Sequence, residues 1–148
     1  MMDTFKRILI ATDGSDSSEH AVRTGLEFAK IVGADVTALS VMEDPVLLST
    51  PADSHMKNLY ALLEQEGKET VKRVKDIGSS MGVNVSVKVV SGNPARVIVD
   101  EGAKCDLIVI GTLGRSGITK LLIGSVAEKV VKLAKCPVLV VRDKGGSQ

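Results

Sequence analysis

Five short apolar runs, each bounded by turn residues, alternate along the chain with segments whose apolar residues recur at helical spacing. The runs at 8–11 and 107–110 are continuously apolar, which is typical of strands buried on both faces of a sheet. The run at 83–89 alternates valine with polar residues, which indicates one wetter face and a place at a sheet edge. The remaining runs lie at 36–41 and 137–141.

Four segments of helical periodicity, at 16–32, 55–81, 94–103 and 126–134, separate these runs. Asp16 and Glu19 have the spacing of a capping box, and Asn93 followed by Pro94 is typical of a helix start. The strict alternation predicts an α/β fold: a five-stranded parallel sheet with helices on both faces. The proline-marked loop at 44–51 is expected to be the most mobile segment.

Because the first and fourth strands are the most apolar, we expect them at the centre of the sheet, which gives the strand order 3-2-1-4-5. In open α/β sheets, ligands bind beyond the carboxyl ends of the strands, where the winding direction reverses. The predicted site is therefore a crevice between the loop at 12–15 and the loop at 111–114.

Length and composition limit the classes of function. The 148 residues, 44% of them hydrophobic, predict one domain over residues 1–143 with a polar tail at 144–148. The net charge of +1 does not favour binding to duplex DNA or to an anionic membrane surface, and 2% aromatic residues are too few for the stacking that single-stranded nucleic acid binders use. No apolar stretch is long enough to span a bilayer. Cys105 and Cys136 are expected to be buried thiols in a reducing cytoplasm, and His20 and His55 are assigned no role.

Glycines mark the loop after the fourth strand and the start of the last helix. Gly111 and Gly114 can adopt positive φ and present backbone N–H groups, and Gly124 lets a ligand approach a helix N-terminus, where the dipole favours phosphate. Ser125 would add a hydroxyl donor. Alternatively, the first two glycines only form a turn, and Ser125 with Glu128 is an ordinary capping box. The spacing alone leaves both interpretations open.

The pattern Gly111-x2-Gly114-x9-Gly124-Ser125 resembles the signature of ATP-binding universal stress proteins. Residues 6–15 are similar to the first strand and acidic loop of that family, residues 114–117 to its glycine loop, and residues 136–141 to its closing strand. The resemblance covers residues 5–142. It implies a Rossmann-like fold of the adenine nucleotide alpha-hydrolase type.

The resemblance also implies ATP in the crevice, with Mg²⁺ or Mn²⁺ bound through the phosphates. Asp13 would bond the nucleoside end, and the backbone at Val41 would touch adenine. The remaining implied contacts are Ala11 and Thr12 as the floor, Ile110, Gly111 and Gly114 along the ribose and phosphates, Gly124, Ser125 and Val126 on the phosphate oxygens, and Arg115 and Lys120 as further phosphate partners. Some ATP-binding members have proline where this chain has Ala11. Asp13 and Asp16 could hold Mg²⁺ together with the nucleotide phosphates, but Asp16 is more simply explained as a helix N-cap.

These features together predict a cytoplasmic, ATP-binding member of the family that acts as a nucleotide-dependent switch or partner-binding module in the stress response. The free edge at Val138–Val141 predicts a homodimer, and the protein partner is not identified. No general base accompanies the phosphate site, so at most slow hydrolysis is expected. The alternatives are a slow ATP hydrolase or nucleotidyl-transfer enzyme of related fold, and a nucleotide-free dimeric scaffold.

Overall fold

The computed structural model describes residues 4–43, 54–112 and 123–142, and for residues 54–56 the backbone alone. The elements run in the order β1 (Arg7–Ala11), α1 (Asp16–Val32), β2 (Asp35–Met42), α2 (Ser54–Ser80), β3 (Val85–Ser91), α3 (Pro94–Gly102), β4 (Leu107–Gly111), α4 (Ser125–Leu133) and β5 (Val138–Val141). The predicted alternation of strands and helices is confirmed, and the ends agree to within two residues.

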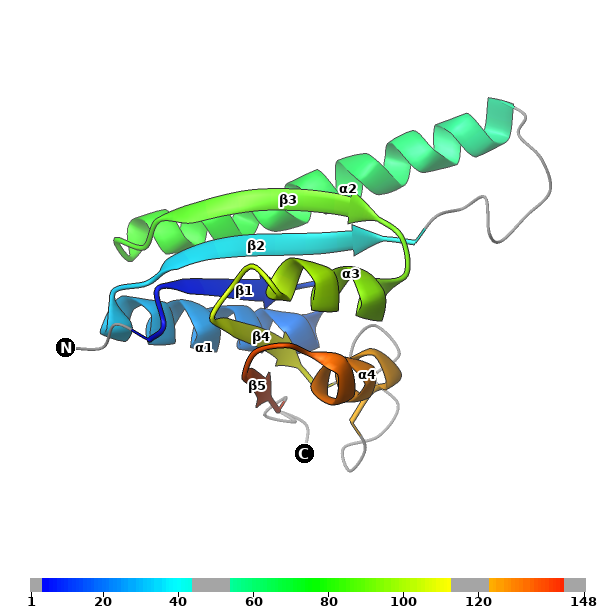
Figure 1. Cartoon of the computed structure of the whole chain (residues 1–148). Helices are drawn as coiled ribbons and strands as arrows, with labels where there is room; N and C mark the ends of the chain where they lie inside the picture. The colour runs from blue at the N-terminus through cyan, green and yellow to red at the C-terminus, as the bar shows by residue number, and fades with distance from the viewer. Residues whose placement is uncertain (1–3, 44–53, 113–122, 143–148) are drawn as a thin grey trace, which may run out of the picture.

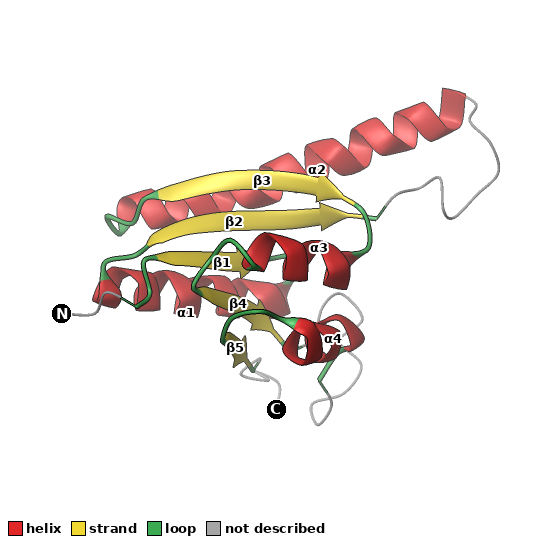
Figure 2. Ribbon diagram, viewed as in Figure 1, coloured by secondary structure: helices red, strands yellow, loops and turns green. Residues whose placement is uncertain are grey.

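The five strands form one sheet in the order β3-β2-β1-β4-β5, as predicted, and all its pairings are parallel. Helices α1 and α2 cover one face of the sheet, whereas α3 and α4 cover the other (Figure 1, Figure 2). The N-terminal part of α2 extends beyond the carboxyl ends of β2 and β3 (Figure 1). The predicted edge position of β3 is confirmed.

Two hydrophobic cores lie on either side of the central strands. Ile8 and Ile10 of β1 point into the core beneath α1 and α2, whereas Leu9 and Ala11 point into the core beneath α3 and α4. Strand β4 divides its residues between the two cores in the same way. Because both faces of these strands are covered, they must be apolar throughout, which is the pattern that the sequence shows.

Glycines in the left-handed region end two of the helices. Gly33 (φ +74°) caps α1, and its N–H donates to the Ala29 carbonyl. Gly82 (φ +82°) follows α2, where the Val83 N–H donates to the Gly78 carbonyl at 2.8 Å. Since Val83 serves the end of α2, β3 starts two residues later than the valine alternation predicts.

Several expectations concern other parts of the chain. The loop at 44–51 falls outside the described residues, as does the tail at 144–148. Both cysteines are free thiols and are half-buried rather than fully buried. Across the described ranges, no helix is both long and apolar enough to cross a bilayer.

Candidate functional site

Strands β1 and β4 lie side by side at the centre of the sheet, with Ile8 opposite Leu107 and Ile10 opposite Val109. The chain leaves β1 into α1 on one face, and the helix that follows β4, α4, lies on the other face (Figure 2). The winding direction therefore reverses between these two strands, which is the arrangement that places ligands at their carboxyl ends. The two loops that the sequence analysis selected leave the sheet here.

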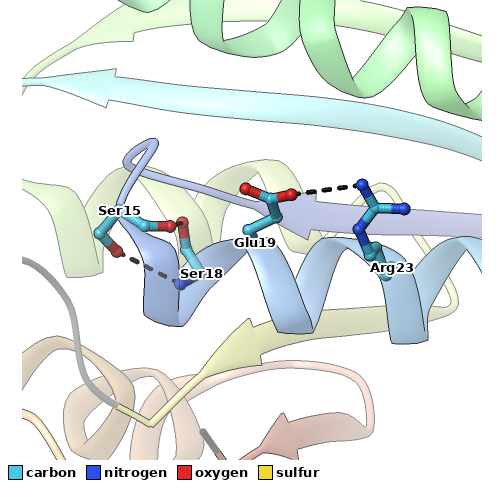
Figure 3. Close-up of polar contacts among 4 residues, drawn as sticks. All are labelled: Ser15, Ser18, Glu19 and Arg23. Carbon is cyan, nitrogen blue, oxygen red and sulfur yellow. Dashed lines mark hydrogen bonds and ion pairs between the residues drawn. The ribbon is translucent and has the colours of Figure 1, made fainter. Parts of the chain in front are cut away.

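The loop after β1 is a tight turn that leads directly into α1. The Ser15 N–H donates to Asp13 Oδ1 at 2.9 Å, and Gly14 between them has φ +82°. Ser15 is extended (φ −75°, ψ 163°), and its hydroxyl accepts the Ser18 N–H at 3.2 Å (Figure 3). Ser15 is therefore the N-cap of α1, and the half-buried Asp13 carboxylate is held at the mouth of the helix.

The predicted roles of Asp16 and Glu19 as a capping box are wrong. Asp16 is the first helical residue of α1, because the serine before it already supplies the cap. The Glu19 carboxylate instead pairs with Arg23 at 3.3 Å, and both side chains are more than half exposed (Figure 3). A capping box requires its first residue to lie outside the helix, so one residue of misplacement removes the motif.

Two buried hydroxyl groups support this loop, and the second of them, that of Ser18, was not predicted from the sequence. Thr12 is 7% exposed and Ser18 is 5% exposed, and their oxygens lie 2.9 Å apart. Ser18 lies on the buried stripe of α1 together with Ala21, Val22 and Gly25. Helical periodicity could therefore have placed Ser18 in the interior, where a hydroxyl needs a hydrogen-bond partner.

Backbone dominates the part of the site contributed by the central strands. The side chains of Ala11 and Ile110 are buried in the core beneath α3 and α4, so only their main chain can face the crevice. Val41 is half-buried near the end of β2. Gly111 does not have the positive φ expected of it. A Cβ added to Gly111 would lie 3.5 Å from the Ser17 carbonyl oxygen, so the end of β4 rests on the first turn of α1.

The N-terminus of α4 faces the same edge of the sheet. Its N-cap is Gly124, extended at φ −61° and ψ 160°, which has no side chain with which to cap the helix. The Gly124 N–H donates to the Thr112 carbonyl, which ties α4 to the end of β4. Ser125 is exposed and is the first helical residue, so the Ser125–Glu128 capping box is also wrong. Backbone N–H groups at such an end suit an anion.

Of the four other predicted residues, the structure describes one. Val126 is half-buried and packs against the core beneath α3 and α4. Gly114 and Arg115 fall outside the described residues, and the same is true of Lys120. The glycine loop between β4 and α4 is thus described only at its two ends.

A cleft of about 360 Å³ lies on the α2 side of the loop after β1. It is lined by Asp13, Gly14 and Ser15 from the loop and by Glu66, Glu69, Thr70 and Arg73 from α2. The sequence pattern does not indicate these α2 residues, because nothing in their spacing relates them to a loop about fifty positions earlier. Within the described ranges, no three His, Cys, Asp or Glu side chains gather as a metal site.

Comparisons with known proteins agree on one family. A model of the universal stress protein family matches residues 4–142. The chain is 41% identical over 140 residues to the universal stress protein MJ0531 of Methanocaldococcus jannaschii. The aligned region covers 93% of this chain and 82% of that protein. The solved structure of the hypothetical protein MJ0577 is similar with a TM-score of 0.84 at 30% identity, over 97% of this chain and 99% of that one. A universal stress protein crystallised in complex with cAMP is similar with a TM-score of 0.73 at 25% identity, over 96% and 100% of the two chains.

Proposed function

This chain belongs to the universal stress protein family, and from that premise we propose that it binds an adenine nucleotide, with ATP as its ligand, in the crevice between the loops after β1 and β4. The observation that carries the proposal is the reversal of winding between β1 and β4, which brings an acidic loop and a helix N-terminus with glycine as its N-cap to one edge. The complex of a relative with cAMP supports an adenine nucleotide as the class of ligand.

The two ends of the proposed site have opposite chemistry. The Asp13 carboxylate can accept hydrogen bonds from hydroxyl or amine groups and would repel phosphate, so we assign it the nucleoside end. The N-terminus of α4 at Ser125 offers backbone N–H groups and the positive end of the helix dipole, so we assign it the phosphates. Mg²⁺ or Mn²⁺ would arrive with the phosphates, because Mg²⁺ is commonly held by substrate phosphates with one or two carboxylates.

A charge substitution at the start of α4 tests the phosphate assignment. Ser125→Asp places a carboxylate where we propose that phosphate binds, although an acidic residue in the first turn favours the helix itself. We expect ATP binding, measured by titration calorimetry with Mg²⁺, to weaken by about tenfold or more, which corresponds to roughly 1.4 kcal/mol. Adenosine, which has no phosphate, should lose little affinity.

Ser86→Asp is the matched control, because Ser86 is an exposed serine of β3 and the change in net charge is the same. That variant should bind ATP as the wild type does. Equal losses for ATP and adenosine with Ser125→Asp, or no loss for either, would contradict the placement of the phosphates at α4.

We also propose a homodimer through β5. The Val141 carbonyl accepts from Thr112 N–H and the Pro137 carbonyl accepts from Ile108 N–H, so these odd-numbered residues of the β5 segment bond to β4. In a parallel strand, the backbone N–H and C=O groups of successive residues point alternately to the two neighbouring sides in the plane of the sheet. The backbone groups of Val138 and Val140 therefore face outward at the sheet edge.

Val140→Pro removes one of these outward N–H groups and no hydrogen bond to β4. Sedimentation equilibrium should show a dimer for the wild type and a monomer for this variant, with circular dichroism reporting that the fold is kept. A wild-type monomer at micromolar concentration would refute the dimer.

The biological role that we propose is a cytoplasmic, nucleotide-dependent switch or partner-binding module in the stress response. A switch is supported by the position of the site on loops and helix ends, because these parts of a fold can change conformation with the smallest loss of packing. Hydrogen exchange with and without ATP tests this role. We expect altered exchange on a surface beyond the crevice, and changes confined to the site would argue for storage or transport of the nucleotide instead.

A further inference from the structure

A chain of hydrogen bonds with a defined direction runs behind the loop that carries Asp13. The Ser18 hydroxyl donates to the Ser15 carbonyl at 3.0 Å, and a carbonyl oxygen can only accept. Since Ser18 has one hydroxyl proton, the 2.9 Å contact between Ser18 Oγ and Thr12 Oγ1 must be donated by Thr12. Thr12 Oγ1 in turn accepts the Gly14 N–H at 3.1 Å. The direction is therefore from Gly14 to Thr12, to Ser18 and to Ser15.

Both hydroxyl groups of this chain are buried, and their exposed fractions are 7% for Thr12 and 5% for Ser18. A buried donor that loses its acceptor cannot turn to water for a replacement. If the Ser18 hydroxyl were removed, the buried Thr12 O–H would lose its acceptor. A Thr12 side chain that turned about its Cα–Cβ bond to reach another acceptor would move Oγ1 away from the Gly14 N–H, because the same oxygen makes both hydrogen bonds.

Asp13 lies between the two ends of this arrangement. On its N-terminal side, the Thr12 N–H donates to the Leu39 carbonyl at 3.0 Å. On its C-terminal side, the Gly14 N–H is held by Thr12 Oγ1, and the Ser15 N–H holds the Asp13 carboxylate itself. The backbone before Asp13 is thus fixed to β2 and the backbone after it to Thr12, and the N-cap Ser15 and the first-turn residue Ser18 lie beside it at the start of α1 (Figure 3).

The same turn of α1 also lies against the end of β4. A Cβ on Gly111, at the end of β4, would lie 3.7 Å from Ser18 Cα, which is ordinary van der Waals contact. Ser18 therefore lies behind the loop after β1 and against the end of β4.

We propose that Ser18 is a positioning residue for nucleotide binding: it acts through Thr12 and Gly14 to hold the Asp13 carboxylate where it meets the nucleoside end of the ligand. The inference rests on the proposed function. Ser18 itself does not touch the nucleotide in this account, since its side chain is buried behind the loop.

A double-mutant cycle between Ser18→Ala and Asp13→Asn tests the inference. The asparagine keeps an oxygen that can accept the Ser15 N–H, so the loop should remain intact while the carboxylate charge is lost. Titration calorimetry with ATP and Mg²⁺ should show that Ser18→Ala weakens binding by about tenfold. If Ser18 acts through Asp13, the double variant should bind within about threefold of Asp13→Asn alone. If the loss of ATP affinity in the double variant equals the product of the losses in the two single variants, the inference is overturned.

A second measurement requires no ligand. Amide hydrogen exchange at Gly14, followed by NMR, should be faster in Ser18→Ala than in the wild type, because the acceptor of that N–H has been released. Val36→Ala serves as the control for general destabilisation, since Val36 is buried at the opposite end of the sheet. That variant should melt at a lower temperature but keep the wild-type affinity for ATP and slow exchange at Gly14.

The outcomes separate this inference from the function on which it rests. If the wild type and Asp13→Asn differ in ATP affinity while Ser18→Ala binds like the wild type, only the role of Ser18 is overturned. Unchanged exchange at Gly14 in Ser18→Ala would overturn it as well. If the wild type binds no adenine nucleotide, the proposed function fails, and the positioning role fails with it.

Discussion

Replacing Gly14 by alanine should destabilise the protein more than the same replacement at Gly82, although both glycines have φ +82°. An L-residue in the left-handed region costs roughly 1–2 kcal/mol, and alanine recovers about 0.4–1 kcal/mol by restricting the unfolded chain. A Cβ on Gly82 meets nothing within 4 Å. Gly82→Ala should therefore lower the free energy of unfolding by about 1 kcal/mol.

At Gly14 a second effect is added. The new methyl group would lie 3.0 Å from Thr70 Oγ1, which is closer than such atoms normally approach. Thr70 is 5% exposed and its hydroxyl donates to the Glu66 carbonyl at 3.0 Å, so the side chain cannot move aside without losing this hydrogen bond or its packing. Overpacking of this kind costs roughly 1–3 kcal/mol. We expect a total loss of about 2–4 kcal/mol for Gly14→Ala, and a fall in Tm of roughly 4–16 °C at about 2–4 °C per kcal/mol.

Equilibrium unfolding in urea measures both variants, with the m-value checked for constancy. The Thr70→Ala background removes the two Thr70 atoms nearest to the added methyl group, at 3.0 and 3.6 Å. In that background the loss caused by Gly14→Ala should fall to the Gly82→Ala value. Equal losses for the two glycine variants in the wild-type background, or a loss that Thr70→Ala does not reduce, would refute the reasoning.

Three further predictions concern other parts of the molecule. Lys88 Nζ lies 2.7 Å from Glu101 Oε1 and lowers the pKa of that carboxyl, so the pair stabilises the fold above the ordinary carboxyl pKa, and this stabilisation is lost as the pH falls through the lowered pKa. Lys88→Met should therefore lower the free energy of unfolding by less than about 1 kcal/mol at neutral pH. The difference between the variant and the wild type should disappear when unfolding is measured at successively more acid pH. Burial raises the pKa of the Cys136 thiol, so its alkylation at neutral pH should be slower than that of a free cysteine and should rise with pH beyond the ordinary thiol range. Gly102→Ala would push a methyl group into Ile108, so it should cost about 1–3 kcal/mol in urea unfolding, and Ile108→Val should relieve part of the loss.

The fold could be predicted from the sequence because a sheet covered on both faces requires central strands that are apolar at every position. Residues 8–11 and 107–110 are apolar at every position, and these strands lie at the centre of the sheet. The alternating run beginning at Val83 gave the edge position of β3, since one of its faces is wetter. The ends of elements were less predictable, because hydrogen bonding at helix ends decides them. Val83 serves the end of α2 and leaves β3 to begin at Val85.

Part of the candidate site could be predicted for a related reason: topology alone brings the loops after β1 and β4 to one edge. Local capping chemistry could not be predicted, because Ser15 and Asp16 are both good N-cap residues and only the backbone conformation decides between them. The contribution of α2 was hidden, since Thr70 meets the Gly14 turn through tertiary packing. Ser18 is the intermediate case, because its place on the buried stripe was visible while its partner was not.

The proposed nucleotide site is best tested by titration calorimetry of ATP with Mg²⁺ into the nucleotide-free wild-type protein. We expect saturable binding of about one nucleotide per chain, with adenosine binding more weakly because it has no phosphate to reach the N-terminus of α4. Absence of binding at millimolar ATP, in protein that is folded by circular dichroism, would contradict the account and leave the loops after β1 and β4 as structural connections alone.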